Sequence, residues 1–172
     1  MKPFLSLHYS SLLFLLAVGS STAPPVDIVK NNMKLLAETA VMRIQKLTAE
    51  FQISPNMVFS GVELIPDITL DRPVEGISSI ADNISTFQVI LLSLPLDSLR
   101  QINADMEGLQ GIVRSLAASF HCPLHKPVAH SHLDTFLKAN VTFHVTIANI
   151  ALNRLQRFLS RLINSLDQLK TC

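Results

Sequence analysis

Cysteine is scarce in this chain of 172 residues, which contains two cysteines and no tryptophan. The two are Cys122 and Cys172, and they follow an N-terminal segment with the pattern of a secretion signal. In an oxidising compartment, a bridge between them would tie the last residue to the body of the protein. Pairing between two molecules is the alternative that the residues alone leave open.

The chain also lacks an excess of charge of one sign, because 14 Lys and Arg stand against 13 Asp and Glu. Nucleic acids and anionic membranes favour proteins with a clustered basic excess. We therefore expect neither as the main partner.

Motifs of catalysis are missing as well. The sequence has no Gly-x-Ser-x-Gly elbow, no phosphate-binding glycine loop and no His-Glu-x-x-His pair, and its five glycines leave little room for loop chemistry. We expect no enzyme and no cofactor. The histidines around Cys122 invite a zinc hypothesis, but with Cys122 oxidised no regular ligand set remains among His121, His125, His130 and His132, so we expect no metal.

The N-terminus has a basic start at Lys2, an apolar run over Leu12–Val18 and small residues over Gly19–Ala23. This pattern predicts a secretory signal peptide over residues 1–21, cleaved somewhere within 19–23, followed by one domain over 22–172. The apolar run is shorter than the roughly 20 residues that a membrane span requires, so a membrane anchor is the weaker alternative and no membrane insertion is expected.

Apolar residues recur at helical spacing in the remaining chain. The first helix is predicted over Val26–Glu50. A second begins at Ser78 or Ser79 as a capping residue and stops at Pro95, and Asp97 is expected to cap a third that ends before Cys122. A short helix over Leu133–Lys138 follows, then a turn or kink within 140–146, then a last long helix with its apolar stripe from Ile147 to Leu169.

The connections indicate the topology. The link between the second and third helices is about three residues long, which forces antiparallel neighbours, whereas the first and last links can travel the length of a helix. The sequence therefore predicts an all-α, up-up-down-down four-helix bundle of the long-chain helical cytokine type, with two long crossovers and one disulfide.

The chain resembles the leptin family of secreted hormones from about Pro24 to Cys172. The resemblance rests on ordered matches that include the two cysteines and the segments Leu36–Ile44, Ser60–Pro66, Gln88–Pro95, Gln101–Ile102, Asp105–Glu107, Leu133–Asp134 and Arg154–Gln156. Divergence elsewhere resembles that of a non-mammalian vertebrate member. The resemblance implies a hormone that is monomeric when free. It also implies that the hormone clusters the leptin receptor ectodomain, a class I cytokine receptor, and starts JAK/STAT signalling that regulates appetite and energy balance.

The resemblance also implies two receptor-binding faces. The main face lies on the first and third helices, at Asn32, Leu35, Thr39, Arg43, Gln101, Asp105, Gly108, Gly111 and Ile112. Leu35, Gly108 and Gly111 depart from the polar residues of the family. The activation face combines a loop element with the start of the last helix, at Val62, Glu63, Leu64, Ile65, Thr146 and Ile147.

Simpler interpretations stand beside these. Arg43 could be a solvated helix charge, the apolar residues of Val62–Ile65 could pin the crossover to the core, and Gly108 and Gly111 could mark the close approach of another backbone. Another helical cytokine, or an amphipathic lipid carrier that uses its apolar stripes to cover lipid, is the alternative function. Two sequons, at Asn83 and Asn140, are candidate N-glycosylation sites, of which Asn140 is favoured because it lies near the kink.

Overall fold

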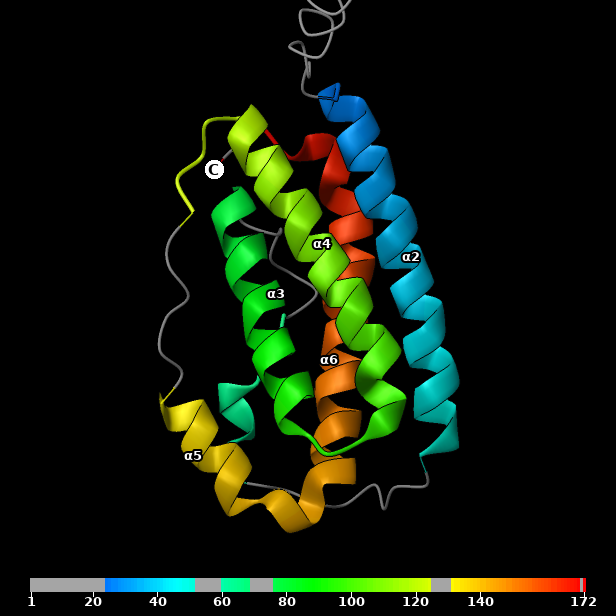
Figure 1. Cartoon of the computed structure of the whole chain (residues 1–172), viewed down its shortest axis with the longest axis vertical. Helices are drawn as coiled ribbons and strands as arrows, with labels where there is room; N and C mark the ends of the chain where they lie inside the picture. Colours follow the sequence, from blue (N-terminus) through cyan, green and yellow to red (C-terminus); the bar gives the residue numbers. More distant parts are fainter. Residues whose placement is uncertain (1–23, 52–59, 69–75, 125–130, 171) are drawn as a thin grey trace, which may run out of the picture.

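The computed structural model describes residues 24–51, 60–68, 76–124, 131–170 and 172, and these residues are helical with no strand among them (Figure 1). The main helices are α2 (Val26–Glu50), α3 (Gly76–Ser93), α4 (Arg100–Ser119), α5 (Ser131–Ala139) and α6 (His144–Ser165). Short 3-10 turns are η1 (Val62–Leu64), η2 (Asp97–Leu99), η3 (Val141–Phe143) and η4 (Leu166–Gln168). The expected signal segment lies outside the described residues.

The four long helices form an up-up-down-down bundle. In Figure 1, α2 and α3 run in one direction and α4 and α6 run in the other. Helix α2 packs along both α4 and α6, and α4 packs along α3. The predicted fold class is confirmed, and it brings α2 and α4 side by side although 49 residues (51–99) separate them in the sequence.

The predicted apolar stripes form the core. Helix α2 buries its apolar residues at three- and four-residue spacing, from Val29 to Leu47, and α6 buries its own from Ile147 to Leu162. Phe87 of α3 and Phe158 of α6 are fully buried, and their ring centroids lie 6.0 Å apart. Leu36, Ile112 and Ile150 are only partly buried at the edge of this core.

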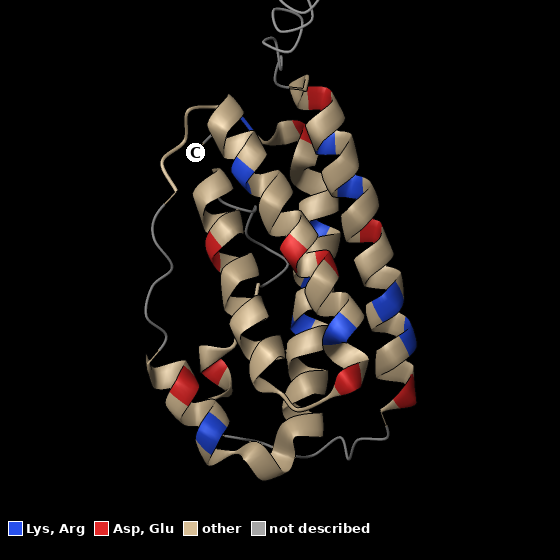
Figure 2. Ribbon diagram, viewed as in Figure 1, with Lys and Arg blue, Asp and Glu red and all other residues tan. Residues whose placement is uncertain are grey.

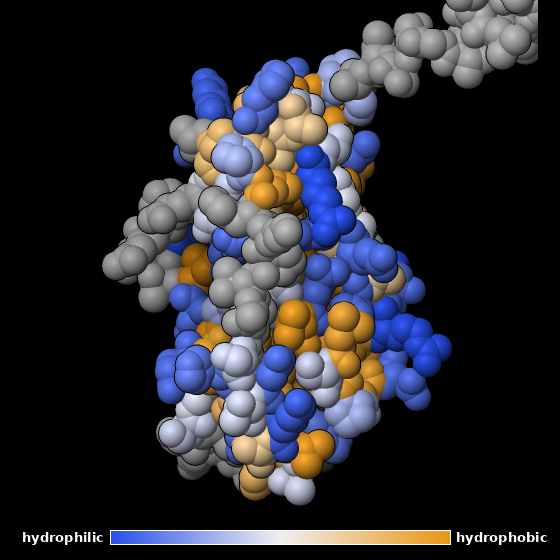
Figure 3. Space-filling view, turned by 60° about the vertical axis from the view of Figure 1, so that its left-hand side comes forward, coloured by the Kyte–Doolittle hydropathy of each residue, from blue (hydrophilic) through white to orange (hydrophobic). Residues whose placement is uncertain are grey.

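Because the stripes pack against one another, they are not available to cover lipid as the carrier hypothesis requires. None of the helices in the described part of the chain has the length and apolar character that a membrane crossing requires. On the face that Figure 3 turns forward, hydrophobic residues stand in separate groups among hydrophilic ones.

Two predicted helix caps are wrong. Helix α3 begins at Gly76, so Ser78 and Ser79 lie inside its first turn, and the Ser78 N–H donates to the Cys172 carbonyl oxygen at 3.0 Å. Asp97 makes no capping hydrogen bond. Its carboxylate pairs instead with Arg100 at 2.8 Å, and η2 leads into α4. At the start of α3, the Cys172 carbonyl oxygen therefore accepts a hydrogen bond from a free backbone N–H, a role that a nearby side-chain hydroxyl has at many helices.

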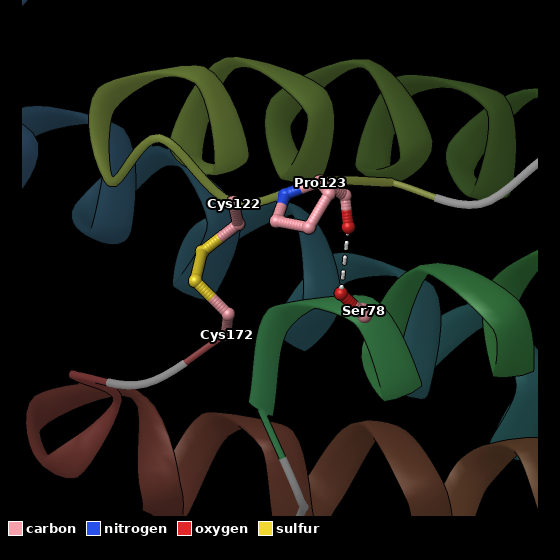
Figure 4. Close-up of a disulfide and its surroundings, with 4 residues drawn as sticks. All are labelled: Ser78, Cys122, Pro123 and Cys172. Atoms are coloured by element: carbon pink, nitrogen blue, oxygen red, sulfur yellow. Dashed lines mark hydrogen bonds between the residues drawn. A yellow bond between two sulfur atoms is a disulfide. The ribbon is translucent and has the colours of Figure 1, made fainter.

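The disulfide joins Cys122 to Cys172, as predicted, with their Cα atoms 5.3 Å apart. Figure 4 shows the bridge beside the start of α3, where the Ser78 hydroxyl donates to the Pro123 carbonyl oxygen at 3.1 Å. The Gly76 backbone has a φ of +61°, and a Cβ there would come within 2.5 Å of the Cys172 backbone. The start of α3, the segment after the end of α4 and the last residue are therefore held together by a disulfide and hydrogen bonds.

The expected kink before the last helix is a 3-10 turn. Residues Val141–Phe143 form η3 between α5 and α6, and two β-branched residues precede an aromatic one in this turn. The Phe143 N–H donates to the Asn140 carbonyl oxygen at 2.9 Å, which closes the turn. After this turn, α6 begins at the lower end of the bundle in the view of Figure 1.

Candidate functional site

The predicted main face lies along the seam between α2 and α4, and an ion pair crosses that seam. Arg43 of α2 donates through Nη1 to both carboxylate oxygens of Asp105 of α4, at 2.5 and 2.7 Å. Gln101, one turn before Asp105, points its side-chain amide at the same carboxylate at 3.4 Å. Three residues that the resemblance assigns to receptor binding therefore contact one another.

These three residues differ in how much surface they offer. The Asp105 side chain is 5% exposed, whereas that of Arg43 is 41% exposed and Gln101 is an exposed residue. A buried carboxylate needs a charged partner, and Arg43 is that partner. The alternative of Arg43 as a merely solvated charge is therefore wrong, and Asp105 holds the two helices together from beneath the surface.

The remaining α2 positions of the main face are Asn32, Leu35 and Thr39. Asn32 is exposed and Leu35 is 62% exposed. The half-buried Thr39 donates its hydroxyl to the Leu35 carbonyl oxygen at 2.8 Å, within α2 itself. Asn32 and Leu35 thus present their side chains outward, while the Thr39 hydroxyl is satisfied by its own helix.

A groove of about 270 Å³ lies on this face between the first half of α2 and the second half of α4. Its lining includes four of the predicted positions, Asn32, Gly108, Gly111 and Ile112. A Cβ on Gly108 would meet the Leu36 side chain at 2.9 Å, and a Cβ on Gly111 would meet nothing within 4 Å. The hypothesis of a closely approaching backbone at these glycines is therefore wrong; their missing side chains leave the groove open.

A second groove, of about 500 Å³, lies between α3 and α4. Gln88, Glu107 and Arg114 are among the residues that line it, together with Asn103 and Gln110, whose buried amide oxygens have no hydrogen-bond partner within the described part of the chain. It is a polar surface, separate from both predicted faces except at Gly111, which borders both grooves.

The loop element of the predicted activation face forms the turn η1, and Arg154 of α6 fastens it to the bundle. The Arg154 Nη1 donates to the carbonyl oxygens of Val62 and Ile65, each at 2.7 Å. Its Nε lies 3.4 Å from Asp67, which also pairs with Arg157 at 3.0 Å. The Arg154 side chain is 14% exposed, so these bonds are largely shielded from water.

The six predicted activation residues divide into surface and support. Glu63 and Leu64 are exposed, Val62 and Thr146 are partly buried, and Ile65 and Ile147 are 0% and 1% exposed. The Glu63 carboxylate accepts from the Gly61 N–H at 3.1 Å. Ile65 and Ile147 therefore pack in the core, where they hold the loop and the helix start in place, and the outward surface comes from Glu63 and Leu64.

Sequence reasoning missed two features at this end of the bundle. The sequence points to Arg154 only as part of the match Arg154–Gln156, although an arginine within an apolar helix stripe needs acceptors nearby. The other is a group of exposed apolar residues around η3, with Val141 56%, Phe143 40% and Val145 36% exposed. Their alternate positions along 141–145 predict a turn or kink and give no signal of exposure.

The sequon asparagines occupy different settings. Asn83 lies within α3 and donates to the Ser79 carbonyl oxygen at 2.8 Å, and Asn140 lies between α5 and η3 and donates to the Phe136 carbonyl oxygen at 2.9 Å. Val141 and Thr142, which follow Asn140, are exposed. Asn140 stays the favoured site.

Among the residues that the structure describes, no group of histidine, cysteine or carboxylate side chains is placed to hold a metal ion. His125 and His130 of the zinc hypothesis lie outside those residues.

Known proteins resemble this chain over most of its length. The family model described as Leptin matches residues 25–172. Curated relatives named leptin are 31% identical over 153 residues in Canis lupus familiaris, 30% over 156 residues in Rattus norvegicus and 29% over 150 residues in Capra hircus. Each alignment covers 87% of this chain and 88% of the relative.

Proposed function

Because the chain belongs to the leptin family, a family of hormones and not of enzymes, we propose that it is a secreted hormone that clusters a class I cytokine receptor, the leptin receptor. Clustering starts JAK/STAT signalling and so regulates appetite and energy balance. The free hormone is a monomer. It leaves the cell by way of the signal peptide over residues 1–21.

The observation that carries this proposal is the presence of two separate surfaces on one bundle. The seam between α2 and α4 offers the main face, and η1 with the start of α6 lies at one end of the bundle (Figure 1). One rigid molecule with two contact surfaces can hold two receptor modules together, and the second contact then forms at a high effective concentration. No chemistry within the bundle is needed.

The main face uses Asn32, Leu35, Arg43 and Gln101 as its outward side chains, with Asp105 as the buried partner of Arg43. The activation face uses Glu63 and Leu64 on η1, and Thr146 near the start of α6. Arg154 fixes the position of η1 through two backbone carbonyl oxygens.

The test is binding of the oxidised chain from residue 22 onward to the leptin-receptor ectodomain of the same species, followed by a STAT reporter assay in cells that express the receptor. Gln101→Ala is the variant of choice for the main face, because Gln101 is exposed and its bond to Asp105 is long. We expect saturable binding that Gln101→Ala weakens. Absence of binding by a monomeric, helical sample would redirect the search to other cytokine receptors.

A further inference from the structure

Three exposed apolar side chains stand in one row on α2. Ile28, Leu35 and Met42 are 50%, 62% and 63% exposed, and each follows the last by seven residues. Seven residues complete about two helical turns, so the three side chains lie on one face over about 20 Å. We call this row the α2 ridge. Large exposed apolar side chains on one face of a helix are a candidate interaction surface.

The α2 ridge borders the groove between α2 and α4. Leu36 and Arg43, which directly follow Leu35 and Met42, turn toward α4, where they meet Gly108 and Asp105. One residue is a rotation of about 100° on a helix, so the ridge lies on the outward side of that contact. Asn32 stands between Ile28 and Leu35 and also lines the groove. Ridge and groove are therefore neighbouring parts of one surface.

This surface offers no unbalanced charge at its centre. The residues that line the groove, among those that the structure describes, are uncharged: Pro24, Val29, Asn32, Gly108, Gly111, Ile112 and Ser115. The pair of Arg43 and Asp105 neutralises itself across the seam. Along the rest of α2 acidic and basic residues are interspersed (Figure 2). An apolar, uncharged surface fits here better than an acidic or a basic one.

A second copy of the chain fits this surface less well. Two helices that pair along a seam need apolar residues at alternating spacings of three and four. The residues four positions after Ile28, Leu35 and Met42 are Asn32, Thr39 and Lys46, which are polar. The α2 ridge is therefore a single row beside a groove, and such a shape accepts side chains from a loop more readily than a whole helix.

We propose that the α2 ridge and the adjoining groove form an apolar recognition site for the receptor, which inserts uncharged, apolar loop side chains between α2 and α4. The inference rests on the proposed function and adds Ile28 and Met42 to the main face. Gly111 leaves space in the groove, because it has no side chain and a Cβ at this position would meet nothing within 4 Å. Recognition at this face depends on apolar contact, with Arg43 and Asp105 as the internal support.

The test compares Leu35→Glu and Met42→Glu with the unchanged chain, in binding to the receptor ectodomain of the same species. Glutamate is a good helix former, and both positions are exposed, so the fold is retained and circular dichroism checks it. Leu92→Glu on α3 is the matched control, because Leu92 is 69% exposed and lines the groove between α3 and α4, not the groove beside the α2 ridge. Leu35→Met is a second control, because it keeps an apolar side chain of similar volume at this position.

We expect each ridge variant to weaken binding by about tenfold or more, while Leu92→Glu and Leu35→Met bind as the unchanged chain does. Binding of the unchanged chain should change little with salt concentration. If the unchanged chain binds and Leu35→Glu and Met42→Glu bind equally well, the inference is overturned and the proposed function stands. If the unchanged chain does not bind at all, the proposed function itself fails. If sedimentation shows a dimer that Leu35→Glu dissociates, the ridge contacts a second copy and the inference is wrong.

Discussion

Arg43 and Asp105 form an ion pair that joins α2 to α4 directly beneath the proposed main receptor face. The pair is asymmetric, since the arginine is 41% exposed and the carboxylate 5% exposed. Removing the arginine would leave a buried carboxylate whose remaining side-chain contact is the Gln101 amide at 3.4 Å. A residue of this kind affects stability and binding together.

The first prediction concerns this pair. We expect Arg43→Ala to lower the free energy of unfolding by about 2 kcal/mol, because truncating one partner leaves the other charge buried and uncompensated, while the exposure of Arg43 lets water soften the penalty. The double variant Arg43→Gln with Asp105→Asn should lose less than the two single variants added together. Chemical denaturation of Arg43→Ala measures the first effect, and denaturation of the unchanged chain, Arg43→Gln, Asp105→Asn and the double variant measures the second. Strictly additive losses would show that the pair contributes no coupling.

This prediction bears on how receptor binding is tested. Weaker binding by Arg43→Ala has two sources, a lost contact and a disturbed seam between α2 and α4. The α2 ridge variants and Gln101→Ala separate them, because the ridge side chains are exposed and contact no buried charge, and Gln101 is exposed and reaches the Asp105 carboxylate only through a long contact of 3.4 Å.

The second prediction concerns Arg154. We expect Arg154→Ala to loosen η1, because the Val62 and Ile65 carbonyl oxygens and Asp67 lose a shared donor. The amides of Leu64 and Ile65, which donate within η1, should then exchange with deuterium faster. Signalling should require about tenfold more hormone, while binding through the main face stays within about twofold.

Arg157→Ala is the matched control. Arg157 is 49% exposed, and of the three acceptors of Arg154 (the Val62 and Ile65 carbonyl oxygens and Asp67) it pairs with Asp67. We expect little change in exchange at Leu64 and Ile65. An Arg154→Ala protein with unchanged exchange at these amides would contradict the role of Arg154 in holding η1.

The third prediction concerns the disulfide. Replacing both Cys122 and Cys172 by serine should lower the free energy of unfolding by about 4 kcal/mol, because the bridge closes a loop with a sequence separation of 50 residues. The Ser78 amide should exchange faster than it does in the bridged protein, since its acceptor is the Cys172 carbonyl oxygen. Denaturation curves and amide exchange check the two parts separately. Exchange at Ser78 that matches the bridged protein would mean that the chain end stays seated on α3 without the bridge.

The sequence predicts most of the fold because helical period and connection length depend on local residues. The bounds Val26–Glu50 of the first helix and the up-up-down-down order were both predictable in this way. The cap of α3 was not, because its acceptor is the Cys172 carbonyl oxygen, distant in the sequence. Contacts between distant segments leave no periodic signal.

The candidate site was predictable by position and not by role. The resemblance named Asp105 and Ile65 as contact residues, and both are buried. Which side of a helix faces solvent at the edge of a bundle depends on its neighbours, and for Asp105 the neighbour is Arg43 of another helix. Leu35 was named as a departure from the family, but the row that it forms with Ile28 and Met42 emerges only when the exposed fractions are known.

The last prediction uses the two glycines of α4. Gly111→Ala should raise the free energy of unfolding by about 1 kcal/mol, and the melting temperature by roughly 2–4 °C, because alanine favours the helix and its Cβ meets nothing within 4 Å. Gly108→Ala should gain less, because its Cβ would lie 2.9 Å from the Leu36 side chain, which must shift. Thermal unfolding of the two variants measures the difference. Equal gains in the free energy of unfolding would mean that the Leu36 side chain moves aside without cost. A lower free energy of unfolding for Gly111→Ala would contradict the open space around Gly111. Gly111→Leu carries the argument to function, since it should keep the stability gain while filling the groove and weakening the receptor binding proposed above.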